Sequence, residues 1–314
     1  MQKICLVIYI LISIHAFGSD PINYYQVKGT HNSYRKKGLL SLIVPSLRYH
    51  HKSLIDQLNN GVRQFELDLH YNIFKKFRVS HINIIDQRSH CKRIQQCLND
   101  MLKWSKDNPD HFPVTVWFEL KDRDLDRFLP WWKRIRKNEI LKLEKIILSY
   151  MNKDKLIKPS DVMINRSNLR DSVTNYGWPS LNDSRGKFLF VIWNPDIVYA
   201  LDYYNNETYE KLFFIRATSE QQDHVAFFKY DDPLAYKDVI KDLVLKNFMV
   251  STNINNITKD DRYNFSRQDA GIESGAHTLS SDLIYQQPWT GLKYWFDDFY
   301  KPKCNYLFPN CSIE

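Results

Sequence analysis

Histidines and acidic residues gather in four short segments between residues 29 and 121. Gly29–Tyr34 reads GTHNSY and Phe65–Asp68 reads FELD, and Val79–His81 and Trp117–Lys121 follow along the chain. Together these segments supply two histidines, three carboxylates and one amide oxygen. Such groups suit acid–base catalysis around a hard metal ion such as Ca²⁺, which prefers oxygen ligands. The four segments together therefore predict one catalytic site.

The carboxylates lie toward the ends of predicted strands. Side chains alternate across a strand, so Glu66 and Asp68 point to the face opposite Phe65. Two carboxylates on one inward face repel each other unless a cation lies between them. The alternative is a surface strand with an acidic outer edge. Glu119 ends a later strand in the same way, and an ordinary ion pair with Lys121 at the rim is the alternative there.

His31 and His81 follow the first and third predicted strands. A single histidine in such a place is usually a hydrogen-bonded loop residue. Two histidines beside a carboxylate cluster favour catalysis, because phosphodiester cleavage needs one base and one acid near neutral pH. Five other histidines lack this context and are interpreted as structural, namely His50, His51, His70, His90 and His111.

Short apolar runs rich in β-branched and aromatic residues predict the strands that position these groups. The runs lie near residues 25–30, 62–69, 77–80, 114–119, 187–193, 224–229, 247–253 and 275–281.

Helical patterns alternate with the predicted strands. In 92–107, the apolar residues Ile94, Leu98, Met101 and Leu102 share one face. A second pattern covers roughly 124–151, with Pro130 near its first turn or at a break. The alternation predicts a single α/β domain, a distorted TIM (β/α)₈ barrel, whose catalytic residues gather at the carboxyl ends of the strands. The loop-rich segment 152–186 would join the two halves.

The first 18 residues predict a cleaved secretory signal peptide. Lys3 precedes the apolar run from Ile4 to Phe17, which is shorter than the roughly 20 residues needed to span a bilayer. We therefore expect a secreted protein whose mature domain covers residues 19–314.

The cysteines agree with export. Without Cys5, an even number remains, and in an oxidising compartment such cysteines pair as disulfides. Of the three possible pairings, the short loops favour Cys91–Cys97 and Cys304–Cys311. A zinc site is the alternative, but neither spacing matches structural zinc sites.

The net charge of +8 favours a polyanionic partner or an anionic membrane surface, or solvated outer helices. No nucleic-acid-binding module is present, so we expect no nucleic-acid partner.

Several segments resemble phosphatidylinositol-specific phospholipase C, in particular its calcium-dependent, secreted bacterial type. They read GTHNSY, NGVRQFELDLHY, RVSH, NPDHFPVTVWFELKD, RGKFLFVIW, ESGAHTLSSD and KCNYLFPNC, and they extend from about residue 23 to the end of the chain. The resemblance implies a distorted TIM barrel, usually monomeric, that cleaves phosphatidylinositol to diacylglycerol and a cyclic inositol phosphate. No obligate protein partner is expected.

The resemblance also implies residue roles. His31 and His81 would match the family's two histidines, one stabilising the phosphorane and the other protonating the leaving diacylglycerol oxygen. The base for the inositol 2-hydroxyl is Glu119 or His31. Lys121 is a candidate for substrate binding. The residues that would match the Ca²⁺ ligands are Asn32, Glu66, Asp68 and Glu119.

Two differences from the sequence patterns of related enzymes indicate which metal and which substrate to expect. Metal-independent relatives carry a guanidinium where the ion would be, whereas this chain keeps both acids of Glu66-Leu67-Asp68. Enzymes that prefer polyphosphorylated inositides carry lysines where this chain has Val191-Ile192-Trp193, which favours plain phosphatidylinositol or its glycan-linked forms. Membrane contact would come from the barrel rim, for instance Tyr34-Arg35-Lys36-Lys37, which could equally be an ordinary basic loop.

Two other functions stay open. A glycerophosphodiester phosphodiesterase uses a similar barrel, but it opens with a His-Arg-Gly pattern where this chain has Thr30-His31-Asn32. The other is a catalytically silent, secreted lipid- or glycan-binding module.

Overall fold

A computed structural model describes residues 19–312, apart from 39–40, 42, 45–46, 83–85, 122–130, 165–167, 195–202, 204–210, 256–263 and 288–292. The expected signal peptide, residues 1–18, lies outside the described residues, and its cleavage stays a prediction. Among the described helices, none combines the length and the apolar character that a bilayer-spanning segment requires.

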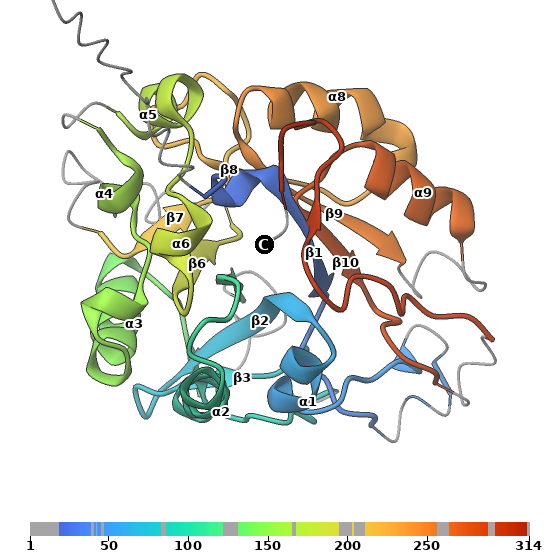
Figure 1. The fold of residues 1–314 in the computed structure, drawn as a ribbon. Helices are drawn as coiled ribbons and strands as arrows, with labels where there is room; N and C mark the ends of the chain where they lie inside the picture. The colour runs from blue at the N-terminus through green and yellow to red at the C-terminus, as the bar shows by residue number, and fades with distance from the viewer. Residues whose placement is uncertain are drawn as a thin grey trace, which may run out of the picture.

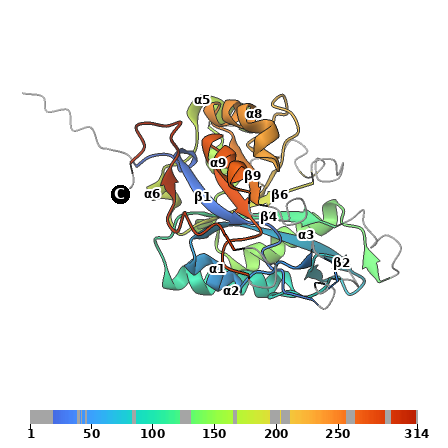
Figure 2. The same ribbon diagram turned by 90° about the vertical axis from the view of Figure 1, so that its right-hand side faces the viewer.

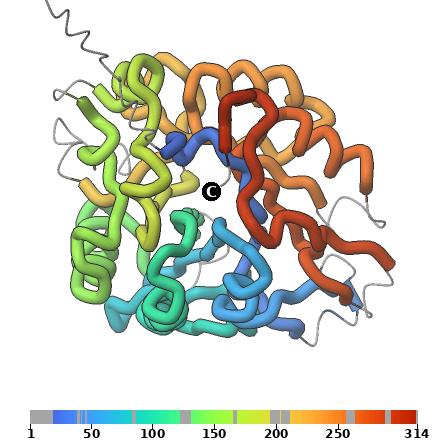
Figure 3. The backbone as a smooth tube through the Cα atoms, viewed as in Figure 1, coloured from blue at the N-terminus to red at the C-terminus, as the bar shows by residue number. Residues whose placement is uncertain are grey.

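Parallel strands form a nearly closed barrel with helices around it, which confirms the predicted α/β fold (Figures 1 and 3). The strand order is β7-β6-β4-β2-β1-β10-β9-β8. A single parallel bridge between Arg216 and Phe227 links β7 to β8. The strands are β1 (Tyr25–Thr30), β2 (Val62–Asn72), β4 (Val114–Leu120), β6 (Phe188–Ile192), β7 (Phe213–Ile215), β8 (Phe227–Tyr230), β9 (Met249–Asn255) and β10 (Thr278–Ser281).

Three further strands pair antiparallel outside the barrel order, namely β3 (Phe77–Val79), β5 (Trp132–Lys133) and β11 (Lys303–Cys304). The prediction that 77–80 is the third barrel strand is therefore wrong. Strand β2 continues past the barrel and turns back, so that Leu69 lies opposite Val79. The barrel strand missing from the prediction is β7, whose three residues are too short to show a periodic pattern.

The helices are α1 (Leu54–Asn59), α2 (Ile94–Asp107), α3 (Lys137–Tyr150), α4 (Pro159–Val162), α5 (Leu169–Tyr176), α6 (Leu181–Ser184), α8 (Pro233–Leu245) and α9 (Phe265–Glu273), with 3₁₀ turns η1 (Ile22–Tyr24) and η5 (Lys153–Lys155). The second predicted helix starts later than expected, because residues 132–133 pair with β2 as β5. Pro130 lies outside the described residues.

The segment predicted as loop, 152–186, contains three short helices. Local capping explains two of them, because the first N–H groups of a helix lack partners within it. The Asp171 N–H donates to Asn168 Oδ1 at 2.7 Å to begin α5, and the Asp183 N–H donates to Ser180 Oγ at 3.1 Å to begin α6.

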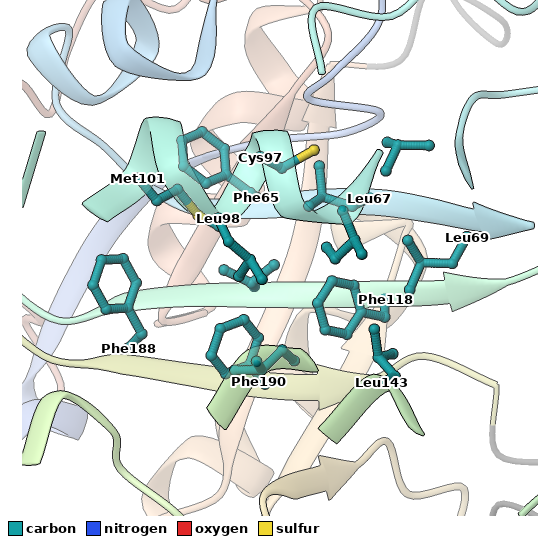
Figure 4. Packing of buried hydrophobic residues seen from close by; sticks show 14 of the residues in the cluster. Phe65, Leu67, Leu69, Cys97, Leu98, Met101, Phe118, Leu143, Phe188 and Phe190 are labelled. Atoms are coloured by element: carbon teal, nitrogen blue, oxygen red, sulfur yellow. The ribbon is translucent and has the colours of Figure 1, made fainter. Parts of the chain in front are cut away.

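The barrel packs its outer face against helices, as the alternation along β2 predicts. Phe65, Leu67 and Leu69 are fully buried and belong to one cluster with Leu98 and Met101 of α2 (Figure 4). The inward face carries the alternate residues of the same strands, so the acids of β2 point into the barrel.

Both predicted disulfides are present. Cys91–Cys97 closes the turn into α2, and Cys304–Cys311 closes a turn near the carboxyl terminus. Cys91 and Cys97 are fully buried in the core.

Candidate active site

Three carboxylates meet inside the barrel, near the carboxyl ends of β2 and β4. The parallel register places Asp68 opposite Glu119 and Glu66 opposite Trp117. One oxygen from each of Glu66, Asp68 and Glu119 lies within 4.8 Å of the other two. Glu66 and Asp68 are almost completely buried, whereas the Glu119 side chain is 21% exposed. The structure thus brings together the three acids that the sequence predicts as metal ligands.

Two largely buried lysines balance much of this negative charge. The Lys121 Nζ donates to Glu119 Oε1 at 2.6 Å and lies 3.1 Å from Asp68 Oδ2. The Lys229 Nζ, from β8, donates to Glu66 Oε2 at 2.6 Å. Burial lowers the pKa of each ammonium, but the neighbouring carboxylates raise it further, so both pKa values lie above their usual range. Both lysines are therefore charged, and three acids face two cations.

The buried setting also changes Glu119. Burial, followed by the charge of Asp68, raises the pKa of this carboxyl to about 7, against the opposing effect of Lys121. A carboxyl with such a pKa can exchange a proton near neutral pH.

The donor chemistry of the cluster fits a hard divalent cation. All three groups offer carboxylate oxygens, the ligands that Ca²⁺ prefers. Within the described residues, the close cation of the buried Asp68 carboxylate is the Lys121 ammonium, 3.1 Å from Oδ2, and neither Asp68 oxygen accepts a hydrogen bond of regular geometry. A buried carboxylate with so few donors keeps acceptor capacity that a bound cation would use.

Asn32 lies beside His31, but its amide is already engaged. Its Oδ1 accepts a hydrogen bond from the Tyr34 hydroxyl at 3.0 Å, and its Nδ2 donates to the Tyr49 hydroxyl at 2.9 Å. The residue is 2% exposed and has a positive φ of 48°. Its part in metal binding stays a prediction.

His31 lies between two carboxylates. Its Nδ1 donates to Asp282 Oδ1 at 2.8 Å, and its Nε2 is 3.5 Å from Glu66 Oε1. Burial alone would lower its pKa, but the charges of Asp282 and Glu66 outweigh burial and raise the pKa to about 9. The ring is 21% exposed, so it is oriented by the protein and still reachable from outside.

His81 is held by a separate acid. Its Nδ1 lies 3.2 Å from Asp86 Oδ2, the oxygen that also accepts a hydrogen bond from Arg35 Nε at 2.8 Å. The Arg35 guanidinium lies over the ring of Tyr49, 4.4 Å from its centroid. The Tyr49 ring in turn stacks near His31, with centroids 6.2 Å apart. A continuous set of buried contacts therefore links the surroundings of the two histidines.

Arg35 and Tyr34 are both fully buried. The expectation that Tyr34-Arg35-Lys36-Lys37 forms an exposed rim is therefore wrong for its first two residues. Arg35 instead fixes the loop after β1, because its guanidinium also donates to the carbonyls of Tyr49 and Leu47.

Most of the histidines interpreted as structural hydrogen-bond to the backbone. Ring nitrogens of His51, His70, His90 and His111 each donate to a main-chain carbonyl. His51 donates to the His31 carbonyl at 2.8 Å, so it supports the catalytic candidate without replacing it.

Sequence reasoning missed Asp282 and Lys229. Both had a signal, because Asp282 directly follows the predicted strand 275–281 and Lys229 ends the predicted strand 224–229. In a barrel, such positions lie at the catalytic end. The sequence alone does not show that Asp282 contacts His31 or that Lys229 contacts Glu66.

Comparison with known proteins identifies a family. Residues 73–305 match the model of a family described as "Phosphoinositide phospholipase C, Ca2+-dependent". No curated protein sequence matches significantly.

Solved structures share the fold. A Ca²⁺-dependent phosphatidylinositol-specific phospholipase C from Streptomyces antibioticus is 20% identical, with a TM-score of 0.63 over 86% of this chain and 96% of that one. A calcium-dependent phosphoinositol-specific phospholipase C from Pseudomonas sp. is 17% identical, with a TM-score of 0.60 over 83% of this chain and 89% of that one. A myoinositol complex of that protein gives the same identity and TM-score over 85% and 91%.

The family match covers well over half of the chain, and the barrel and its acidic cluster agree with it. This chain belongs to the Ca²⁺-dependent phosphoinositide phospholipase C family, whose members are phosphodiesterases.

Proposed function

We propose that this protein is a secreted, Ca²⁺-dependent phosphodiesterase that cleaves phosphatidylinositol into diacylglycerol and a cyclic inositol phosphate. One observation carries the proposal: His31 is held by Asp282 and faces Glu66, beside the three-carboxylate cluster. An oriented imidazole next to a cation site is the arrangement that intramolecular attack on a phosphodiester requires.

The ion would be held by Glu66, Asp68 and Glu119, with Asn32 as a further candidate. When bound, Ca²⁺ supplies charge neutralisation at a non-bridging phosphate oxygen and acidifies the inositol 2-hydroxyl. Lys121 and Lys229 keep the remaining charge of the carboxylates balanced. Lys121 is also our candidate for a contact with a substrate phosphate, which would share its ammonium with Glu119 and Asp68.

The chain's own residues move the protons. Glu119 is our candidate for the base that takes the 2-hydroxyl proton, because it is the partly exposed carboxylate of the cluster; His31 is the alternative. The 2-oxygen attacks phosphorus, and the bond from phosphorus to the diacylglycerol oxygen breaks as the cyclic phosphodiester forms. His31, kept protonated by Asp282 and Glu66, stabilises the pentacoordinate phosphorane.

His81 would protonate the leaving oxygen. Its Nδ1 faces Asp86, which leaves Nε2 as the nitrogen that can donate to diacylglycerol. The ring is 24% exposed and follows β3, so a substrate can reach it.

Plain phosphatidylinositol is the proposed substrate. Val191 and Ile192 of β6 are fully buried, so this part of the strand offers no cation to an additional phosphate. Initial rates on vesicles should be faster with phosphatidylinositol than with its bisphosphate, and the opposite order would contradict this preference.

The activity is tested by diacylglycerol release from phosphatidylinositol vesicles, with Ca²⁺ or with EGTA. We expect release by the wild type only with Ca²⁺, and loss of release in His31→Ala. His224→Ala is the matched control, because this histidine precedes β8 at the opposite end of the barrel. Equal release by His31→Ala and wild type would contradict the mechanism, and full release in EGTA would contradict the metal assignment.

The same assay separates the other candidates. A glycerophosphodiester phosphodiesterase would cleave water-soluble glycerophosphoinositol in preference to membrane phosphatidylinositol. A silent lipid- or glycan-binding module would bind vesicles and release nothing.

A further inference from the structure

The hairpin between β2 and β3 exposes apolar side chains at its tip. Ile73 is 41% exposed and Phe74 is 73% exposed. Trp131, which is 46% exposed, lies next to them, because its carbonyl accepts the Ile73 N–H at 2.9 Å. We call Ile73, Phe74 and Trp131 the hairpin patch. Single exposed apolar residues are ordinary, but a cluster of three large ones is a candidate contact surface.

The hairpin patch lies on the active-site side of the barrel. Strand β2 carries Asp68 toward its carboxyl end and then runs on to the tip, and β3 leads back to His81. At about 3.3 Å per residue, the strand from Asp68 to Ile73 reaches about 16 Å beyond the acid cluster. Figure 2 shows the barrel from the side, with β2 toward the right of the view. One hairpin therefore connects a metal-ligand candidate, the patch and a catalytic histidine.

The surroundings of the hairpin patch are basic. Lys75 and Lys76 lie in the same turn, and Lys133 and Arg134 follow Trp131; all four side chains are exposed. Within the described part of the chain, none of the four has an ion-pair partner. Lys246, by contrast, is paired with Asp242 and Glu220. These four cations are thus available to an external anion.

The hairpin is anchored from behind. Tyr71 and Phe77 lie opposite each other in the β2–β3 register and are buried in the core. Lys142 of α3 donates to the Lys75 carbonyl at 2.6 Å and to the Tyr71 hydroxyl at 3.2 Å. These contacts fix the base of the hairpin against the core and α3. The apolar side chains at its tip are therefore exposed on an ordered hairpin.

We propose that the hairpin patch docks this protein on an anionic membrane surface. Ile73, Phe74 and Trp131 enter the interfacial layer, and the four cations contact lipid headgroups. Apolar and aromatic side chains flanked by Lys and Arg are what such an interface accommodates, and each basic residue near it adds attraction. This inference rests on the proposed function, because an enzyme that cleaves phosphatidylinositol must reach an anionic lipid in a membrane.

Vesicle binding tests this docking surface apart from catalysis. The vesicles contain phosphatidylcholine with or without phosphatidylglycerol, neither of which carries inositol. We expect wild type to co-sediment with the anionic vesicles, and less so as salt rises. Phe74→Ser should weaken the partition coefficient by roughly tenfold to a hundredfold, the effect of losing most of one buried phenyl group.

Two further variants sharpen the test. Leu245→Ser is the matched control, because this leucine is 53% exposed at the far end of α8; its binding should equal that of wild type. The double variant Lys75→Ala/Lys76→Ala should weaken binding to anionic vesicles and leave the weak binding to pure phosphatidylcholine unchanged. Circular dichroism confirms that each variant is folded.

The outcomes separate this inference from the proposed function. If Phe74→Ser binds anionic vesicles as well as wild type, the docking surface is wrong, whether or not the protein cleaves phosphatidylinositol. If Phe74→Ser instead abolishes a wild-type dimer and leaves vesicle binding unchanged, the patch is a contact between two copies, which also overturns it. Phe74→Ser should cleave monomeric short-chain phosphatidylinositol at the wild-type rate and vesicles more slowly.

Discussion

The Nδ1 atom of His31 lies 2.8 Å from Asp282 Oδ1, although the two residues are 251 positions apart. The parallel register of β1 and β10 places Thr30 opposite Ser281, so the next residue of each strand meets at the barrel mouth. The Asp282 N–H donates to the Asn255 carbonyl at 3.0 Å, which fixes the backbone beside the carboxylate. The acid therefore orients the imidazole and favours its protonated form.

Asp282→Asn tests this orientation. The amide keeps the size of the side chain and removes its charge, so the imidazolium loses its main stabilising partner. We expect kcat for phosphatidylinositol to fall by about 10²-fold or more, the usual effect of losing one electrostatic group in an active site. Asp238→Asn, an exposed acid on α8, is the matched control. A wild-type rate in Asp282→Asn would show that this contact has no catalytic role.

Lys229→Met tests the balance of charge in the acid cluster. Removing the ammonium leaves the buried Glu66 carboxylate without its close partner, and breaking such a pair is costly. Thermal unfolding in EGTA should therefore occur at a lower temperature than in wild type. Because Ca²⁺ then has less competition for the carboxylates, its addition should raise the Tm by more than in wild type. Lys237→Met, on the surface of α8, should change neither value, and an equal Ca²⁺ increment in Lys229→Met and wild type would count against the assignment.

The buried ring of His277 leads us to expect a lower free energy of unfolding in acid. The ring is buried: its Nδ1 accepts the Val250 N–H at 3.0 Å, and its Nε2 donates to the Asn23 carbonyl at 2.8 Å. Burial lowers the pKa of this histidine from 6.5 to about 4. The unfolded chain therefore takes up a proton first, and the contribution of His277 is complete above pH 6.5 and lost as the pH falls toward 4.

The magnitude is on the order of 3 kcal/mol, at about 1.4 kcal/mol for each pKa unit. Urea unfolding at pH 5 and pH 7 measures about 2 kcal/mol of this, because the folded state is protonated only near pH 4. His277→Asn should lower the free energy of unfolding at both values and reduce the difference between them. An unchanged difference would mean that other groups, such as His111, account for the acid sensitivity.

The disulfides predict a measurable stabilisation. Cys91 and Cys97 are separated by 6 positions, and Cys304 and Cys311 by 7. Loops of this length stabilise the folded state by about 2 kcal/mol through the entropy of the unfolded chain. Replacing either pair with serine should lower the free energy of unfolding by that amount, and by more at Cys91–Cys97, where the hydroxyls are buried. Equal stability after removal of both pairs would contradict this expectation.

The sequence predicts much of the barrel because strand patterns are local. The alternation in β2 and β4 places the three acids inside, and the structure confirms it. The role of 77–80 was predicted wrongly, because a short apolar run does not reveal whether its neighbour is parallel or antiparallel. The three residues of β7 are too few to show any period.

Two site residues were not predicted from the sequence, for a different reason. The roles of Asp282 and Lys229 depend on contacts with residues of distant strands. The strand order of the barrel brings each residue next to its partner. The exposed tip at Phe74 was also hidden, because an apolar residue next to lysines looks like part of a strand in sequence. Burial of Arg35 was equally unpredictable, since its partner Asp86 lies 51 positions away.

Titration calorimetry of Ca²⁺ into the metal-free protein tests the central claim most directly. The account predicts one bound ion per wild-type chain and loss of that binding in Glu66→Gln/Asp68→Asn, with circular dichroism showing that the variant stays folded. Retention of wild-type Ca²⁺ binding by this folded variant would contradict the account, because the ion would then lie elsewhere than between these carboxylates.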